Sequence, residues 1–214
     1  MDYTEEVTLP DWVPGPEEKP APMPLLLVQA FVNTSNLDEE TDLLADDTTA
    51  NTWLRQAGLL GAEFSAAGQD LQAAREVREG IRALLAASGG GPPATDAGLR
   101  PLQAVTFAAQ PRLTVDHDGQ VQLEPESRGR PADGLVRLLL IIRDAQHDGT
   151  WPRLKACGNP DCQWAFYDRS HSRRGTWCDM SSCGNLIKNR NLRARRSSQP
   201  SAAQPAAAAA AAQP

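Results

Sequence analysis

A chain of 214 residues with a formal net charge of −6 has room for one medium-sized domain and one small one. Apolar runs such as residues 138–142 are far too short to cross a membrane. The acidic, proline-rich N-terminal segment lacks the basic start and apolar run of a signal peptide. We therefore expect a cytoplasmic protein without a membrane partner. The excess of arginine over lysine is typical of a GC-rich bacterial genome.

Charge is distributed unevenly along the chain. Residues 1–150 contain 11 Lys and Arg against 24 Asp and Glu, a balance of −13. Residues 151–196 contain 10 against 3, a balance of +7. An acidic body joined to a small basic end indicates a sensing or assembly domain attached to a nucleic-acid-binding module.

The first part of the body has mainly helical periodicity. The apolar run at residues 25–32 fits a buried strand or a first helix, and periodicity does not decide between them. Residues 42–60 carry spaced apolar positions and end at glycines. Residues 65–87 carry the clearest helical stripe, before a Ser-Gly-Gly-Gly-Pro-Pro stop, and residues 99–109 continue in the same style.

The period then changes to that of a strand. Apolar residues alternate with polar ones on both sides of an Asp-Gly turn in residues 113–123, which predicts a β-hairpin. A strongly apolar helix follows Pro131 and ends near His147, and a basic helix is predicted to start near Gly184. The expected fold class is α+β but mainly α. It comprises a helical N-terminal domain with a small β-hairpin, then a small treble-clef-like or ribbon-like module with a basic C-terminal helix.

All four cysteines lie in the basic end, at Cys157, Cys162, Cys178 and Cys183. Four residues separate each pair and fifteen lie between the pairs, a spacing that lets two elbows hold one tetrahedral ion. Two disulfides would also fit, but a reducing compartment favours metal. Four protein ligands leave no open coordination position, so we predict one structural Zn²⁺ without metal catalysis. At about 40 residues, this segment is near the size at which a metal must support the core.

Aromatic and basic side chains surround the cysteines. Trp164, Phe166, Tyr167 and Trp177 fit a small core over the metal, with a stacking surface for single-stranded bases as the alternative. Arginine bridges phosphate oxygens and binds guanine edges, so the basic residues are predicted to contact nucleic acid. A solvated charge run, or docking on an acidic protein, is the alternative. The predicted nucleic-acid-binding residues are Arg169, Arg173, Arg174, Lys188, Arg190, Arg193, Arg195 and Arg196.

The cysteine segment resembles a known family. Its motifs Cys157-Gly-Asn-Pro-Asp-Cys162, Trp177-Cys178 and Cys183-Gly184-Asn185, followed by a basic helix, are similar to those of the CGNR zinc-finger proteins. Residues 31–34, 42–54 and 71–85 resemble the ABATE domain, that family's usual partner. The resemblance implies a bacterial, stress-responsive transcription regulator. It would bind zinc through the four cysteines and bind double-stranded DNA, and would be associated with the nucleoid.

This resemblance divides the chain into four parts. We expect an ABATE-like domain at residues 22–150 and a CGNR-type finger at 151–196. The segments 1–21 and 197–214 have low-complexity or Pro- and Glu-rich composition, and we predict that both are disordered. The family motif ends in arginine, whereas this chain has Leu186 there. A DNA contact worth about 1–3 kcal/mol of base discrimination would then be missing.

The acidic domain shows little catalytic chemistry. It has no nucleophile elbow and no phosphate-cradling glycine loop, so we expect no enzyme activity. Asn33 and Thr34 would fit a small-ligand pocket for an effector, and a helix cap or turn is the other interpretation.

The leading functional hypothesis is a zinc-dependent, DNA-binding transcription regulator that responds to stress or to a ligand. An interaction adaptor whose basic finger docks on an acidic protein, or on RNA, is the alternative. A homodimer is a further expected partner, because one finger has a small footprint on DNA.

Overall fold

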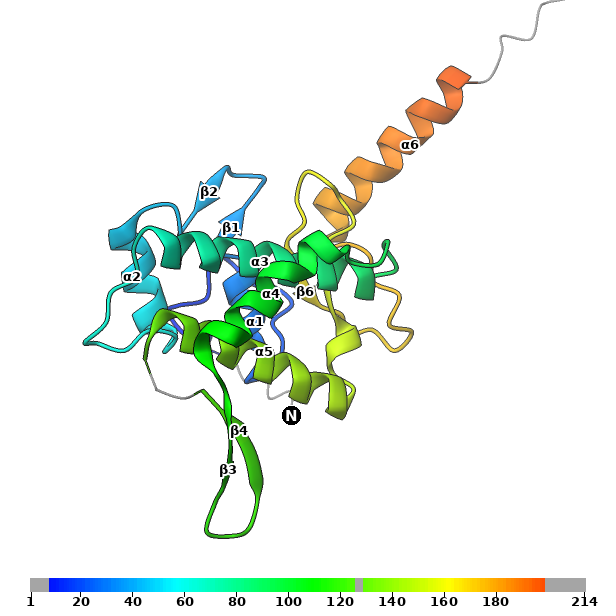
Figure 1. The fold of residues 1–214 in the computed structure, drawn as a ribbon. Helices are drawn as coiled ribbons and strands as arrows, with labels where there is room; N and C mark the ends of the chain where they lie inside the picture. The colour runs from blue at the N-terminus through cyan, green and yellow to red at the C-terminus, as the bar shows by residue number, and fades with distance from the viewer. Residues whose placement is uncertain (1–7, 126–128, 199–214) are drawn as a thin grey trace, which may run out of the picture.

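The computed structural model describes residues 8–125 and 129–198 (Figure 1). Its body contains the helices α1 (Leu25–Val32), α2 (Asp47–Gln56), α3 (Gln69–Ser88), α4 (Asp96–Ala109) and α5 (Pro131–Asp148). All eight residues of α1 are buried, which is why its sequence shows no periodicity: a helix with apolar surroundings on every side has no polar face.

Local capping sets where the helices begin. The Asp46 side chain accepts a hydrogen bond from the Thr49 amide at the start of α2, and Thr95 accepts one from Gly98 at the start of α4. The predicted element at residues 42–60 is therefore shorter than expected. Its first residue, Asp42, instead ends strand β2 (Thr41–Asp42), which pairs with β1 (Ser35–Asn36).

The predicted β-hairpin is present. Strands β3 (Arg112–Val115) and β4 (Val121–Glu124) are antiparallel, with Val115 opposite Val121 across the Asp-Gly turn. The side chains of Leu113, Val115 and Val121 are 67–73% exposed, because the hairpin extends away from the helices (Figure 1).

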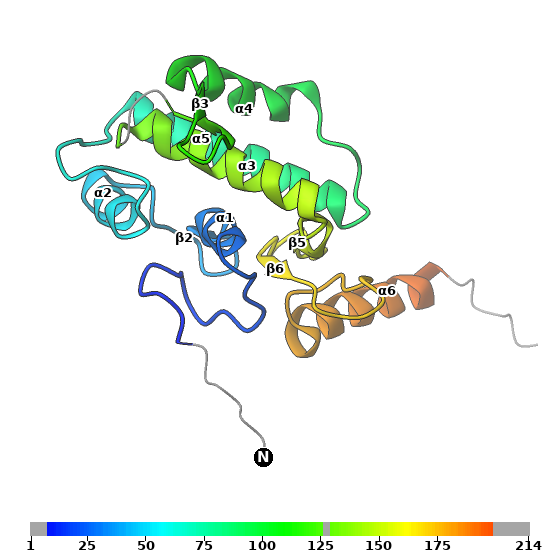
Figure 2. The ribbon, with the colours of Figure 1, turned by 90° about the horizontal axis from the view of Figure 1, so that it is seen from below.

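The helices and the cysteine segment share one hydrophobic core. Helices α3, α4 and α5 lie on one side of α1, as Figure 2 shows. Strands β5 (Leu154–Ala156) and β6 (Ala165–Tyr167) form an antiparallel pair that packs against α3 and α1. Their residues Leu154 and Ala165 are fully buried in the same cluster as Phe31 and Leu138. The structure is thus mainly helical, with small hairpins and a cysteine module ending in helix α6 (Asn185–Ser198), which confirms the predicted fold class.

The structure differs from the sequence-based prediction of disorder over residues 8–21, here called the N-terminal strap. The strap crosses the face of α1 that is opposite to α5 (Figure 2). Trp53 donates a 2.7 Å hydrogen bond to the Trp12 carbonyl, and Ala21 is 4% exposed. Predicted disorder at residues 1–7 and 199–214 lies outside the described residues, whereas Ser197 and Ser198 end α6. Within residues 8–125 and 129–198, no helix has the length and apolar character needed to cross a bilayer.

Candidate metal centre

The fold brings the four cysteine sulfur atoms together. All four Sγ atoms lie within 4.8 Å of one another, with 3.7 Å between Cys162 and Cys178 and 3.8 Å between Cys178 and Cys183. A Zn–S bond of about 2.3 Å gives a tetrahedron with edges of about 3.8 Å. The spacing of these thiols therefore fits a single zinc ion held by four cysteines.

Each cysteine pair is held by its own turn. In the first elbow, Cys157 donates its amide to the Trp164 carbonyl at 2.9 Å, and Cys162 donates to the Asn159 carbonyl at 3.0 Å. In the second, the Asp179 carboxylate accepts the amides of Ser181 and Ser182, which starts a π-helical turn over Met180–Gly184. Backbone hydrogen bonds in the first elbow and the Asp179 side-chain cap in the second hold the cysteines of each pair on one side of its turn.

Glycines permit close packing where the two elbows meet. A Cβ atom at Gly184 would lie 2.5 Å from Met180 Sδ and 3.1 Å from the Trp177 ring. Similarly, a Cβ atom at Gly158 would lie 2.8 Å from the Thr176 methyl group. These glycines in the two cysteine motifs therefore allow the two elbows to pack closely.

The thiols are electrostatically coupled. The pKa of Cys157 is lowered because the Cys162 and Cys178 thiols donate hydrogen bonds to its sulfur. The pKa values of Cys162 and Cys178 are raised by hydrogen bonding to Cys157, by burial and by its charge. Asn159 Nδ2 lies 3.5 Å from Cys183 Sγ and donates to it. A divalent cation at the centre of the four sulfur atoms would favour the thiolate form of all of them.

A buried ion pair supports the loop between the elbows, residues 168–176, here called the basic loop. Lys155 Nζ donates to Asp168 Oδ2 at 2.8 Å, to the Arg173 carbonyl at 2.6 Å and to the Gly175 carbonyl at 3.1 Å. Burial alone would raise the pKa of Asp168, but hydrogen bonds from Lys155, Ser170 and Gly175 hold it well below its usual range. The sequence-based prediction of site residues did not include this pair, because one lysine and one aspartate 13 residues apart form no recognisable motif.

The four aromatic residues do not form one small core over the metal: Tyr167 belongs to the core that the cysteine segment shares with the helices, whereas Trp164 and Trp177 pack on the cysteines. Phe166 and Tyr167 are buried, at 1% and 8% exposure. Trp164 and Trp177 are half-buried and pack on the cysteine cluster. The Trp164 ring also donates a hydrogen bond to Glu17 of the N-terminal strap at 3.1 Å. Phe166 and Tyr167 are therefore too deeply buried to stack on single-stranded bases.

The predicted nucleic-acid-binding residues lie on two surfaces. Arg169, Arg173 and Arg174 are exposed on the basic loop, although Arg169 also donates to the Pro20 carbonyl at 2.8 Å. The other five lie on α6, which projects from the finger (Figure 1). Along residues 185–197, Ile187 is the one side chain that is not exposed.

Asn33 and Thr34, predicted as pocket residues, face the protein interior instead. Asn33 Oδ1 accepts the Ala165 amide at 2.8 Å, and Asn33 Nδ2 donates to the Ala165 carbonyl at 2.9 Å. Thr34 donates to the Phe31 carbonyl and accepts from Arg78. Both side chains are 2% exposed, so their observed role is to tie α1 to β6 and α3.

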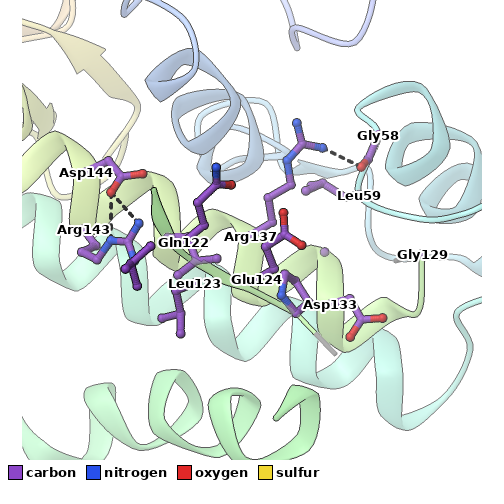
Figure 3. Close-up of a pocket in the computed structure, with 14 residues that line it drawn as sticks. Gly58, Leu59, Gln122, Leu123, Glu124, Gly129, Asp133, Arg137, Arg143 and Asp144 are labelled. Carbon is purple, nitrogen blue, oxygen red and sulfur yellow. Dashed lines mark hydrogen bonds and ion pairs between the residues drawn. The ribbon is translucent and has the colours of Figure 1, made fainter. Parts of the chain in front are cut away.

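A cavity of about 720 Å³ lies elsewhere, between β4, α5 and the loop after α2 (Figure 3). Arg137 crosses it to donate to the Gly58 carbonyl at 2.9 Å. Arg143 and Asp144 form an ion pair of 2.7 Å at its edge. The cavity is lined by both apolar and charged side chains, and neither Asn33 nor Thr34 contributes to it.

The fold and the cysteine cluster define a zinc-finger protein, with a helical domain before a site that is able to bind one zinc ion. Residues 26–147 match the ABATE family model, described as "Putative stress-induced transcription regulator", and residues 153–196 match the CGNR zinc-finger model. The chain therefore belongs to the ABATE family and carries a CGNR zinc finger at its C-terminal end. A search of curated proteins found no match.

Proposed function

We propose that this protein is a zinc-dependent transcription regulator that binds double-stranded DNA through its finger. The observation that carries the proposal is α6, which has five basic residues, no acidic residue and almost no contact with the body. An isolated helix of 14 residues is marginal in water, and mutual repulsion of five cations weakens it further. A polyanion such as DNA would stabilise it.

The two basic surfaces support this proposal in different ways. The basic loop is held rigid by the Lys155–Asp168 ion pair and presents Arg173 and Arg174 to solvent. Helix α6 starts directly after the last cysteine, so zinc binding would fix its origin. Zinc dependence of DNA binding follows, because both surfaces are anchored on the elbows that the metal holds together.

An effector and a second copy of the chain are the other partners that we propose. The cavity beside α5 is the site that we propose for a small-molecule or stress-linked effector, in place of Asn33 and Thr34. A homodimer would double the footprint of a single small finger on DNA. In a bacterial cell such a regulator would be cytoplasmic and associated with the nucleoid.

The test is binding of the zinc-loaded full chain to random-sequence duplex DNA across a salt series. Each phosphate contact contributes about 0.9 to the slope of log K against log salt. The triple variant Arg190→Ala/Arg193→Ala/Arg195→Ala in α6 is expected to lower the slope by up to about 3. The charge-matched control is Arg55→Ala/Arg100→Ala/Arg112→Ala in the body, where all three residues are exposed. It should leave the slope unchanged.

Absence of duplex binding at low salt, with one zinc per chain confirmed, would exclude the proposal. Salt-tolerant binding to an acidic protein would then identify the finger as the docking surface of an adaptor. If both triple variants lower the slope equally, binding depends on overall charge, and the finger has no special role.

A further inference from the structure

Helix α6 has two different sides. Ile187 is half-buried, and Arg190 Nη1 lies 3.5 Å from Asp161 of the first elbow, so these two residues mark the side that faces the finger. Successive residues of an α-helix are about 100° apart around its axis, so the residues on the side away from the finger can be identified. They form one continuous stripe along the helix. We call this the outer stripe of α6; its members are Asn185, Lys188, Asn189, Leu192 and Arg196.

We propose that the outer stripe reads base edges in the major groove of DNA. This inference rests on the proposed function and adds to it which side chains select a sequence. Helix α6 has 14 residues, which gives a length of about 21 Å. An α-helix with side chains is about 10–12 Å across, which fits a major groove about 12 Å wide.

The chemistry of the outer stripe fits bases better than phosphates alone. Lysine and arginine bind guanine, asparagine binds adenine through both its amide atoms, and an apolar side chain contacts the thymine methyl group. Binding to phosphates would need only the cations. The stripe has all three side-chain types, at spacings of three and four residues along one side of the helix.

Asn189 is the central member of this stripe. Asparagine is a poor helix former in a helix interior, so an exposed Asn there lowers helix stability relative to alanine. Asn189 is exposed and has no side-chain hydrogen-bond partner within residues 8–125 and 129–198. No contact within the described residues therefore compensates for this loss of helix stability. A partner outside the chain with paired donor and acceptor groups, such as an adenine edge, would do so.

Leu186 lies outside the outer stripe. It lies about 100° from Asn185 around the helix, next to Arg193 and toward the finger-facing side. The arginine that the family motif has at this position would therefore flank the outer stripe. Its replacement leaves the five stripe residues in place.

The experiment uses two asparagines of the same helix. Asn189 and Asn191 are both exposed and both lack a side-chain partner among the described residues. They are separated by about 200° around the axis, so only Asn189 lies in the outer stripe. The zinc-loaded full chain is used to select an enriched sequence from randomised duplex DNA. Asn189→Ala and Asn191→Ala are then compared on that duplex and on the unselected pool.

We expect Asn189→Ala to lose about 5- to 150-fold in affinity for the enriched duplex, as loss of one bidentate base contact predicts. It should bind the unselected pool normally. Asn191→Ala should stay within about 2-fold of the wild type on both, with zinc content and helix content equal in the two variants. Restoration of affinity for Asn189→Ala by a changed base at one position would identify the base that it reads.

Several results would overturn the inference. Equal affinities of the two variants on the enriched duplex would do so, as would salt-dependent binding without any enriched sequence. In both cases DNA binding, and hence the proposed function, would stand. Failure to bind any duplex at low salt would instead remove the proposed function and this inference together.

Discussion

The Lys155–Asp168 ion pair offers the sharpest test of how the basic loop is built. The two side chains are 5% and 4% exposed, and Asp168 accepts the amides of Ser170 and Gly175 as well as the lysine. Replacing Asp168 with Asn leaves the Lys155 ammonium buried without its counter-charge. Removing one partner of a buried pair costs about 3–5 kcal/mol. That is a large part of the usual stability of a domain.

The assay is urea denaturation of the zinc-loaded chain at neutral pH. With an m-value of about 2 kcal/mol/M, the midpoint should fall by roughly 1.5–2.5 M urea for Asp168→Asn. The control is Asp144→Asn, because Asp144 pairs with Arg143 at 2.7 Å while both side chains are largely exposed. Surface pairs of that kind contribute about 0–1 kcal/mol.

A loss of stability in Asp168→Asn no larger than in Asp144→Asn would refute the reasoning. The variant Lys155→Met/Asp168→Asn completes the comparison. It removes both charges, so it should be more stable than Asp168→Asn alone if the unpaired ammonium causes the loss.

Three further predictions concern the zinc ion, the contact of Asn33 with β6, and the Asp42–Arg78 ion pair. Chelation of zinc should lower the unfolding temperature of the whole chain in one calorimetric transition, because β5 and β6 share the core of the helices; a separate finger transition would contradict this. Asn33→Ala removes the side chain that binds both the amide and the carbonyl of buried Ala165, and should cost about 2–5 kcal/mol by urea denaturation. Asn36→Ala, where the side chain accepts only the amides of the exposed turn after β1, should cost under about 1 kcal/mol. Burial raises the pKa of Asp42, but Arg78 outweighs this and lowers it, so the stabilisation is present above pH about 4 and is lost as the pH falls. Hence the stability difference between wild type and Asp42→Asn should shrink in acid; a constant difference from pH 7 to pH 3 would rule out this linkage.

Patterns local in sequence predicted much of the fold. The hairpin was predicted from alternation around one Asp-Gly turn, and α3 and α5 from helical stripes bounded by Gly and Pro. The four cysteines were predicted as one cluster from spacing alone, and their sulfur atoms do lie together. For α1 the sequence does not distinguish a helix from a strand, because eight residues that are all buried carry no period.

Contacts between distant residues were not predictable in this way. Gln29 of α1 and Asn33, directly after α1, bind the Ala165 backbone through side-chain amides, and Glu17 accepts a hydrogen bond from Trp164. Such bonds join positions more than 130 residues apart, and no periodicity or spacing rule marks them. The N-terminal strap was therefore predicted as disordered from its Pro- and Glu-rich composition, although the structure places it across α1.

Helix α6 is attached to the rest of the protein at its N-terminal end, so a small rotation there moves its C-terminal end by a larger distance. Its pivot is the second cysteine elbow, and its far end is about 21 Å away. A tilt of the finger by about 10° would move that end by roughly 3.7 Å, which exceeds the 3.4 Å between successive nucleotides along a strand. Small rearrangements at the junction of α1 with β6 would therefore be magnified into a shift of about one base pair. The acidic domain would not need to touch DNA to change which sequence the helix meets.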